Sequence, residues 1–294
     1  MSLLLLFLDG VGLGRAEASN PLHATPTPHL DRWLGASWEL AEASAIAIDA
    51  NLDTPGLPQS ATGQAALLTG VNAAQVMDGH YGPWPGPTLR RLIDQGTLVS
   101  DWTAHAGVGG VAWANAYPPG YFTARASGRL KPSAMTYAAE VAGVPLSGLD
   151  AYQDGQAFAA DLDGQAFHEW GIDPPGGFVD GPAGAERAGR RLAQHAANQA
   201  LTVLDVWTTD RAGHQADPVA AASLVARLDA FIGGVLTAAP AELQVVLTSD
   251  HGNLEDLGHG RHTRASVPFA VHGTRFHQTP GSLTDVRSVL QPNA

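Results

Sequence analysis

The 294-residue chain contains no cysteine, which excludes disulfides, thiolate metal sites and cysteine nucleophiles. Lys131 is its only lysine, and the 16 basic residues are outnumbered by 28 acidic ones. The resulting formal net charge of -12 argues against a basic surface for non-specific nucleic-acid binding. An anionic substrate must therefore be attracted locally, by metal ions or by a few arginines.

We expect neither a targeting segment nor a membrane span in this sequence. The apolar run from Leu3 to Leu8 has no basic start and stops at Asp9, so it is too short for the apolar part of a signal peptide. We find no apolar run of the length expected for a membrane span. We therefore expect a cytoplasmic protein with no membrane or nucleic-acid partner. Its oligomeric state is not readable from the sequence.

Hydrophobic residues make up 45% of the chain, which is enough for a full core. Strand patterns alternate with helical patterns, which predicts an α/β fold with a doubly wound, mostly parallel sheet covered by helices. The expected strands are residues 3–8, 201–207, 243–247 and 267–271. The expected helices are residues 29–35, 60–68, 86–95, 182–200, 217–236 and 282–290.

The middle of the chain differs from both ends. It is rich in Gly and Pro, as in the stretch Tyr117-Pro118-Pro119-Gly120, and its strand signals are weak. We interpret residues 76–194 as an inserted cap or lid together with a connecting helix. Residues 1–75 and 195–294 would then form the core.

Three of the expected strands end on carboxylate or imidazole side chains. These side chains are Asp9 after 3–8, Asp210 and His214 after 201–207, and Asp250 and His251 after 243–247. A further histidine, His262, follows eleven residues after His251. The carboxyl ends of strands in an open α/β sheet form the crevice where ligands bind. Because Asp and His suit divalent metals such as zinc and manganese, the pattern predicts one metal centre built from distant segments.

The order of these residues and their local sequences resemble the alkaline phosphatase superfamily. Within that superfamily, the resemblance is to the cofactor-independent phosphoglycerate mutases and the phosphopentomutases. It is carried by Leu8-Asp9-Gly10-Val11-Gly12, Gln59-Ser60-Ala61-Thr62-Gly63, Asp210-Arg211-Ala212-Gly213-His214, Ser249-Asp250-His251-Gly252-Asn253 and the stretch from His262 to Pro268. The stretch around Ser60 is the weakest match, and the resemblance covers residues 1–75 and 195–294.

This resemblance implies two divalent metal ions, either manganese or zinc. The first ion would be held by Asp210, His214 and His262. The second would be held by Asp9, Asp250, His251 and the hydroxyl oxygen of Ser60, which would also be the catalytic nucleophile. Two ions can hold the attacking and leaving oxygens of a phosphoryl transfer, and coordination activates a serine hydroxyl.

Alternatives remain open for two of these positions. Ser60 at a helix start can be no more than a helix cap, and Thr62 is a rival nucleophile two residues further on. His259 is a rival to His262 as a metal ligand.

The resemblance implies phosphoryl transfer on a small phosphorylated substrate. A mutase must exclude water between its half-reactions, and the middle region is short and has few arginines, so we expect hydrolysis by a phosphatase or phosphodiesterase. A phosphomutase is one alternative, and a metal-binding protein without turnover is another. The candidate substrate-binding residues are Arg211, Arg261 and Arg264, which lie beside ligand positions, and Asn115 from the cap.

Overall fold

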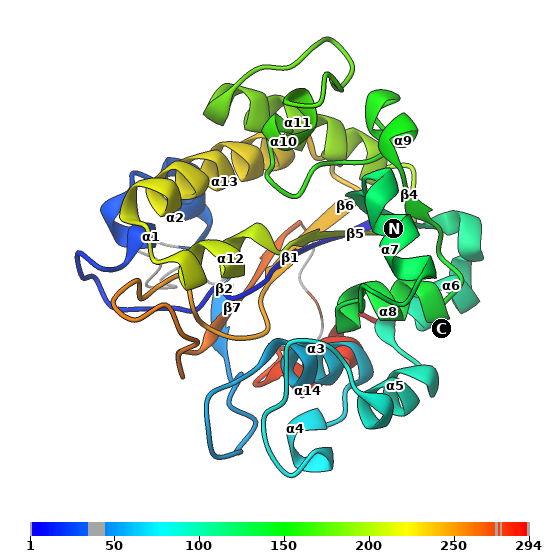
Figure 1. The fold of residues 1–294 in the computed structure, drawn as a ribbon, viewed down its shortest axis with the longest axis vertical. Helices are drawn as coiled ribbons and strands as arrows, with labels where there is room; N and C mark the ends of the chain where they lie inside the picture. Colours follow the sequence, from blue (N-terminus) through cyan, green and yellow to red (C-terminus); the bar gives the residue numbers. More distant parts are fainter. Residues whose placement is uncertain (1, 35–44, 274–275, 277, 293–294) are drawn as a thin grey trace.

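One mostly parallel sheet organises the molecule, as the computed structural model shows (Figure 1). The structure describes residues 2–34, 45–273, 276 and 278–292. Within these residues the sheet has seven strands in the order β2-β7-β6-β1-β5-β3-β4. The strands are β1 (Ser2–Leu8), β2 (Ala45–Ile48), β3 (Val111–Ala116), β4 (Leu146–Ser147), β5 (Leu201–Val206), β6 (Leu243–Thr248) and β7 (Val267–His272).

The central strands are all parallel. β1 pairs with β5 and β6, and β3 pairs with β5 and β4, whereas β7 runs antiparallel to β6 and β2 antiparallel to β7. Every residue of β5 and β6 is buried, which is the pattern of strands covered on both faces. The predicted α/β class with a doubly wound, mostly parallel sheet is confirmed.

Helices cover the sheet on both faces, as Figure 1 shows. Alternate side chains of a strand point to opposite faces. Accordingly, Leu5 belongs to one hydrophobic core with α3, α5, α6, α8 and α14, and Leu6 to a second core with α2, α11 and α13. The helices are α1 (Pro21–Ala24), α2 (Pro28–Leu34), α3 (Ser60–Thr69), α4 (Ala73–Val76), α5 (Pro87–Asp94), α6 (Leu98–Ala106), α7 (Pro119–Ala126), α8 (Ala134–Val141), α9 (Leu149–Gln153), α10 (Gln165–His168), α11 (Gly181–Ala196), α12 (Thr208–Gln215), α13 (Pro218–Ala238) and α14 (Leu283–Leu290), with a 3-10 turn at Val108–Gly110.

Helix α13 is long and apolar enough to cross a membrane by length and composition alone, a feature that the sequence patterns above did not reveal. In the structure it packs along α11, and 56% of its most apolar window is buried inside the protein. Leu228 and Phe231 lie in the core beside the sheet. A Cβ at Gly189 of α11 would lie 2.0 Å from the backbone oxygen of Phe231, so only glycine permits this close approach of the two helices.

The middle region differs from the expectation. Residues 76–194 were expected to form an inserted cap with a connecting helix, yet β3 and β4 lie within them and extend the sheet beside β5. The interpretation of this whole region as a cap is therefore wrong for its strands. β3 was missed because its sequence, Val111 to Ala116, is half alanine and contains an asparagine, and both residues have low strand propensity.

Candidate metal centre

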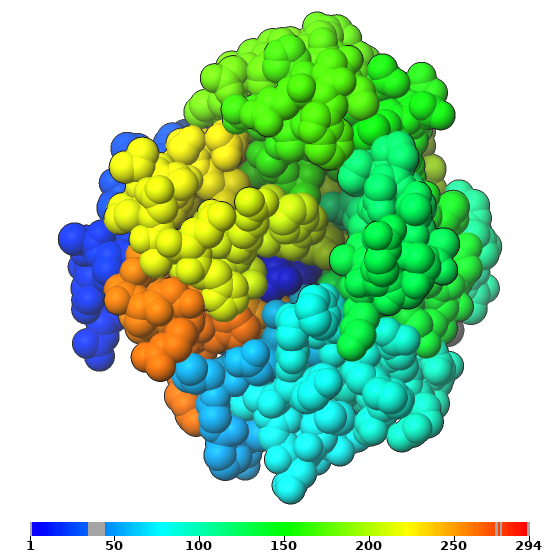
Figure 2. Space-filling view, viewed as in Figure 1, coloured from blue at the N-terminus to red at the C-terminus, as the bar shows by residue number. Residues whose placement is uncertain are grey.

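The predicted ligands lie together at the carboxyl ends of β1, β5 and β6. The face shown in Figure 2 is hollowed in its middle, and the dark-blue N-terminal segment is visible at the bottom of the hollow. The yellow segment that contains α12 borders this hollow. The parallel pairing of β1 with both neighbours aligns the three strand ends, which explains why residues far apart in the chain meet here.

Four of the residues form an inner cluster, which consists of Asp9, Ser60, Asp250 and His251. The Nε2 atom of His251 lies 3.4 Å from Asp9 Oδ1, 3.5 Å from Asp250 Oδ2 and 2.9 Å from Ser60 Oγ. All four residues are buried. Ser60 is the first residue of α3, so the start of this helix directs the hydroxyl into the cluster.

The other three residues form an outer cluster, which consists of Asp210, His214 and His262. Asp210 and His214 lie one turn apart on α12, and His214 Nε2 is 3.3 Å from Asp210 Oδ2. The Nε2 atom of His262 is 3.5 Å from Asp210 Oδ1 and 3.1 Å from His214 Nε2. The side chain of His214 is 47% exposed, so this cluster opens to solvent.

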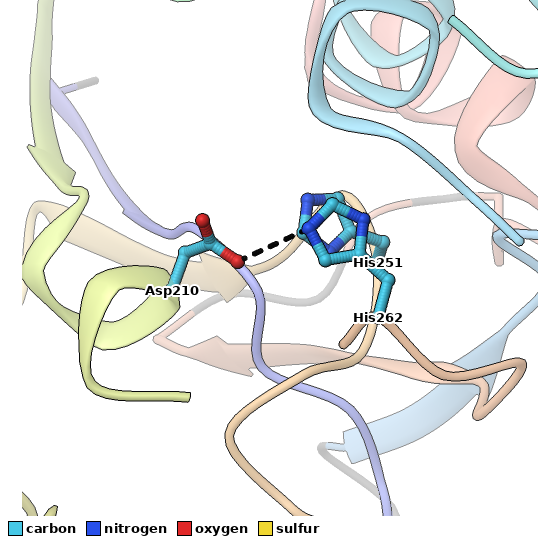
Figure 3. A group of neighbouring side chains, drawn as sticks. All are labelled: Asp210, His251 and His262. Carbon is cyan, nitrogen blue, oxygen red and sulfur yellow. Dashed lines mark ion pairs between the residues drawn. The ribbon is translucent and has the colours of Figure 1, made fainter. Parts of the chain in front are cut away.

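His251 connects the two clusters. Its ring stacks on that of His262 with 3.8 Å between the ring centroids, and Asp210 approaches the pair from α12 (Figure 3). Ligand atoms of Asp210, His251 and His262 lie within 4.8 Å of one another, and so do those of Asp9, Asp250 and His251. The structure therefore brings all seven predicted residues into one continuous centre, whereas the resemblance assigned His251 to one site only.

The three histidines share one orientation. Their Nδ1 atoms face backbone carbonyl oxygens, at 3.3 Å for His251, 3.0 Å for His214 and 2.7 Å for His262. Because a carbonyl only accepts, each Nδ1 carries a proton and each Nε2 is directed into the centre, as in metal-bound histidines. Zinc ligands at 2.0–2.1 Å in tetrahedral geometry lie roughly 3.3–3.4 Å apart. The histidine Nε2 atoms lie 3.3–3.5 Å from the carboxylate oxygens of Asp9, Asp210 and Asp250, which is close to that spacing. The residues therefore fit divalent ions.

The charges of the centre favour a cation. Burial and the neighbouring Asp9 carboxylate raise the pKa of Asp250 to about 8, and burial also raises the pKa of Asp9. Although burial lowers the pKa of His251, the Asp250 and Asp9 carboxylates outweigh it and raise that pKa to about 10. These raised pKa values show that the buried carboxylates crowd one another and that the metal-free centre holds protons, which a divalent ion would replace.

Three supporting residues were not predicted from the sequence. Asn253 donates a hydrogen bond from Nδ2 to Asp210 Oδ1 at 2.6 Å. Buried Glu255 accepts from the backbone N–H groups of Gly12 at 2.9 Å and Asn253 at 2.8 Å, and also from the hydroxyl of Thr263. It therefore ties together the segments that carry Asp9, Asp250 and His262. The third residue is Gln64, one turn after Ser60 on α3, which bonds to both inner carboxylates.

The structure separates the rival candidates. The hydroxyl of Thr62 lies 3.1 Å from the carbonyl oxygen of Gln59 and 3.3 Å from that of Tyr81, away from the inner cluster. His259 pairs with Asp256 at 3.3 Å outside the centre. Ser60 and His262 are thus the residues placed for the predicted roles, although their chemistry stays a prediction.

The predicted substrate-binding residues fall into two groups. Arg211, Arg261 and Arg264 are exposed and form no ion pair within the described part of the chain. Arg264 also lines an open cavity of about 690 Å³ with Asn51 and other polar residues.

Asn115 does not lie in a cap. It is a buried residue of β3 whose amide donates to the Asp205 carbonyl at 2.7 Å and accepts from the Asp205 N–H at 2.9 Å. This side chain fastens β3 to β5, so its placement in a cap was wrong, while its role in substrate binding stays a prediction.

Comparison with known proteins places these features in a family. A model of the metalloenzyme superfamily matches residues 1–291. No curated protein matches the chain. Among solved structures, the chain is similar to the alkaline phosphatase of the Antarctic bacterium TAB5, with 14% identity, a TM-score of 0.56, and coverage of 98% of this chain and 96% of that chain.

Two further structures show the same likeness. The PH0037 protein of Pyrococcus horikoshii is 15% identical with a TM-score of 0.52, over 92% of this chain and 85% of that one. The phosphoglycerate mutase of Leishmania mexicana, solved at low cobalt concentration, is 11% identical with a TM-score of 0.52, over 100% of this chain and 96% of that one. At these identities the likeness is one of fold.

Proposed function

Because the chain belongs to the metalloenzyme superfamily and has the alkaline phosphatase fold, we propose that it is a metal-dependent phosphohydrolase with Ser60 as its nucleophile. The observation that carries this proposal is the position of the Ser60 hydroxyl. It lies buried at the start of α3, 2.9 Å from His251 Nε2, where the inner and outer clusters meet. A structural metal site needs no such hydroxyl, whereas phosphoryl transfer through a phosphoserine does.

The residues of the centre would have two kinds of role, metal binding and the positioning of the ligands. The outer cluster would hold one divalent ion and the inner cluster a second, with Ser60 Oγ among the inner ligands. Two such ions lower the pKa of a serine hydroxyl and offset the charge that develops on phosphoryl oxygens. Asn253 and Glu255 keep the ligand-bearing segments in place through the hydrogen bonds described above.

In the reaction that we propose, Ser60 Oγ bonds to phosphorus while the bond from phosphorus to the substrate alcohol breaks. The Ser60 hydroxyl gives up its proton, the alcohol oxygen leaves with one proton in exchange, and Ser60 carries the phosphoryl group. Water then attacks this phosphoserine and releases inorganic phosphate. At the start of α3, the N–H groups of Thr62 and Gly63 donate to the carbonyl oxygens of Tyr81 and Gln59, so those of Ser60 and Ala61 are the ones that would face the phosphoryl oxygens.

Hydrolysis is favoured over transfer back to the substrate by the open outer cluster. The side chain of His214 is 47% exposed and Asp210 is 18% exposed, so water reaches this side of the centre. A phosphomutase must exclude water between its half-reactions. The neighbouring Arg211 and Arg261 are exposed and unpaired in the described residues, and they supply positive charge for a phosphorylated substrate.

The test compares the wild-type protein with a Ser60→Ala variant after metal removal and reloading with zinc or manganese. Each protein is assayed on p-nitrophenyl phosphate, bis(p-nitrophenyl) phosphate and 3-phosphoglycerate. We expect metal-dependent phosphate release by the wild type and its loss in Ser60→Ala. Full activity of Ser60→Ala would remove the nucleophile, and isomerisation of 3-phosphoglycerate without phosphate release would show a mutase instead.

A further inference from the structure

Gln64 is not a predicted metal ligand or substrate-binding residue, yet it bonds to two of the predicted ligands. Its side chain is fully buried on α3, one helical turn beyond Ser60. The amide nitrogen donates to Asp9 Oδ2 and to Asp250 Oδ2, both at 3.1 Å. The amide oxygen accepts from the backbone N–H of Met135 at 3.3 Å, at the start of α8. Both ends of the amide are therefore used, and Met135 fixes which end faces the carboxylates.

Hydrogen bonds occupy three of the four oxygens of the two inner carboxylates, and Gln64 makes two of these bonds. Asp9 Oδ2 accepts from Gln64, whereas Asp9 Oδ1 is buried, accepts no hydrogen bond from the described residues and lies 3.4 Å from His251 Nε2. On Asp250, Oδ1 accepts from the Gly10 N–H at 3.2 Å and Oδ2 accepts from Gln64. Chelation of an ion by both oxygens of either carboxylate would compete with these hydrogen bonds. One-oxygen coordination by each carboxylate is thus favoured.

We propose that Gln64 is a positioning residue that holds Asp9 and Asp250 as one-oxygen ligands and so limits the inner cluster to a low coordination number. This inference rests on the proposed metal centre. With Ser60 Oγ and His251 Nε2, the inner cluster then offers four donor atoms. Four donors suit zinc, whereas manganese and magnesium prefer about six, with more oxygen. The inner cluster is therefore selective for zinc.

A glutamate at position 64 would not hold the two carboxylates as one-oxygen ligands. It would keep the shape of the side chain and the acceptor for Met135, but it has no N–H for the two carboxylates. A third carboxylate beside Asp9 and Asp250 would also add repulsion and a further ligand oxygen. The amide is the one side chain of this size that donates twice without adding charge.

The experiment uses the full-length protein with Gln64→Met and Gln64→Glu, and with Thr69→Val as a matched control. Thr69 is buried on the same helix and bonds to the Ala65 carbonyl at 2.6 Å, so its replacement perturbs α3 without touching the centre. Zinc and manganese affinities are measured by competition titration on metal-free protein. The visible absorption of the cobalt-loaded proteins reports coordination number, because four-coordinate cobalt absorbs far more strongly than six-coordinate cobalt.

We expect Gln64→Met to weaken zinc binding at the inner cluster by about 10–100-fold, because loss of a hydrogen bond to a metal ligand typically has an effect of this size. We also expect it to reduce the preference for zinc over manganese. Gln64→Glu is expected to shift cobalt toward the weak six-coordinate spectrum. The outer cluster, whose ligands Gln64 does not contact, is the internal control for both variants. Thr69→Val should leave affinities and spectrum unchanged.

The outcomes separate the inference from the proposed function. Unchanged zinc affinity and cobalt spectrum in both Gln64 variants would overturn the role of Gln64 while leaving the metal centre intact. A wild-type preference for manganese at the inner cluster would overturn it as well. Failure of the wild type to bind any of these metals would remove the centre itself. Metal binding without phosphate release would remove only the proposed reaction.

Discussion

The inner and outer clusters both combine Asp and His, with Ser60 added in the inner one, but they differ in how they are enclosed. Asp250 and His251 of the inner cluster are fully buried, whereas the side chain of His214 in the outer cluster is 47% exposed. The inner ligands follow central strands and are fixed by Gln64 and Gly10, while α12 presents its ligands at the edge of the hollow. The inner cluster is thus enclosed by protein, whereas the outer cluster is open to solvent at His214.

Loss of an inner ligand should have the largest effect. Asp250→Asn keeps the shape of the side chain and an acceptor for Gly10, but it removes one of two buried anions. We expect the number of bound ions to fall from two to one and kcat/KM to fall by about a thousandfold or more. Metal content and steady-state kinetics measure both effects. Retention of two tightly bound ions would contradict the importance given to the enclosed inner cluster.

Loss of an outer ligand should have a smaller and separable effect. In His214→Ala, Asp210 and His262 remain, and water can fill the open position. We expect about 100-fold weaker binding of one ion and unchanged binding of the other, which titration of metal-free protein resolves. Gln215→Ala, at the exposed end of the same helix, is the matched control. Equal weakening of both ions would mean that the two clusters act as one.

The sequence predicted the metal ligands better than the residues that hydrogen-bond to them and hold them in place. Asp9, Asp210 and Asp250 follow strands whose carboxyl ends meet at one edge, so the pattern of strand ends alone predicts that these carboxylates converge. Gln64 belongs to no motif in the sequence, because its role depends on the fold bringing α3 beside Asp9 and Asp250, which follow β1 and β6. β3 was missed for the opposite reason, since its alanines form a strand only through pairing with β5.

The buried charges predict how pH acts on the metal-free protein. The pKa of His251 is raised to about 10 in the folded chain, above its ordinary 6.5, so its stabilisation is complete below pH 6.5 and is lost as pH rises toward 10. Asp250, with its pKa raised to about 8 from 3.8, also favours the folded state least at high pH. We expect Tm to fall between pH 7 and 10 without metal.

Bound metal should reverse that trend, because an ion replaces the protons of the inner cluster and binds more tightly as pH rises. Thermal unfolding of metal-free and zinc-loaded protein across this range measures the difference. A metal-free protein whose Tm is constant from pH 7 to 10 would show that the inner cluster does not carry the buried charge assigned to it.

The smallest effect is expected just outside the inner cluster, at Thr62. This residue lies half a turn from Ser60, but its hydroxyl bonds to Gln59 and Tyr81 instead of facing the metal ligands. Thr62→Val keeps the shape of the side chain, so we expect a loss of about 1 kcal/mol in stability from the missing hydrogen bonds and an activity within about threefold of wild type. Chemical denaturation and kcat/KM measure the two quantities. If activity instead fell as far as in Ser60→Ala, Thr62 would be the nucleophile, and the inner cluster would have to include a residue two positions further along α3.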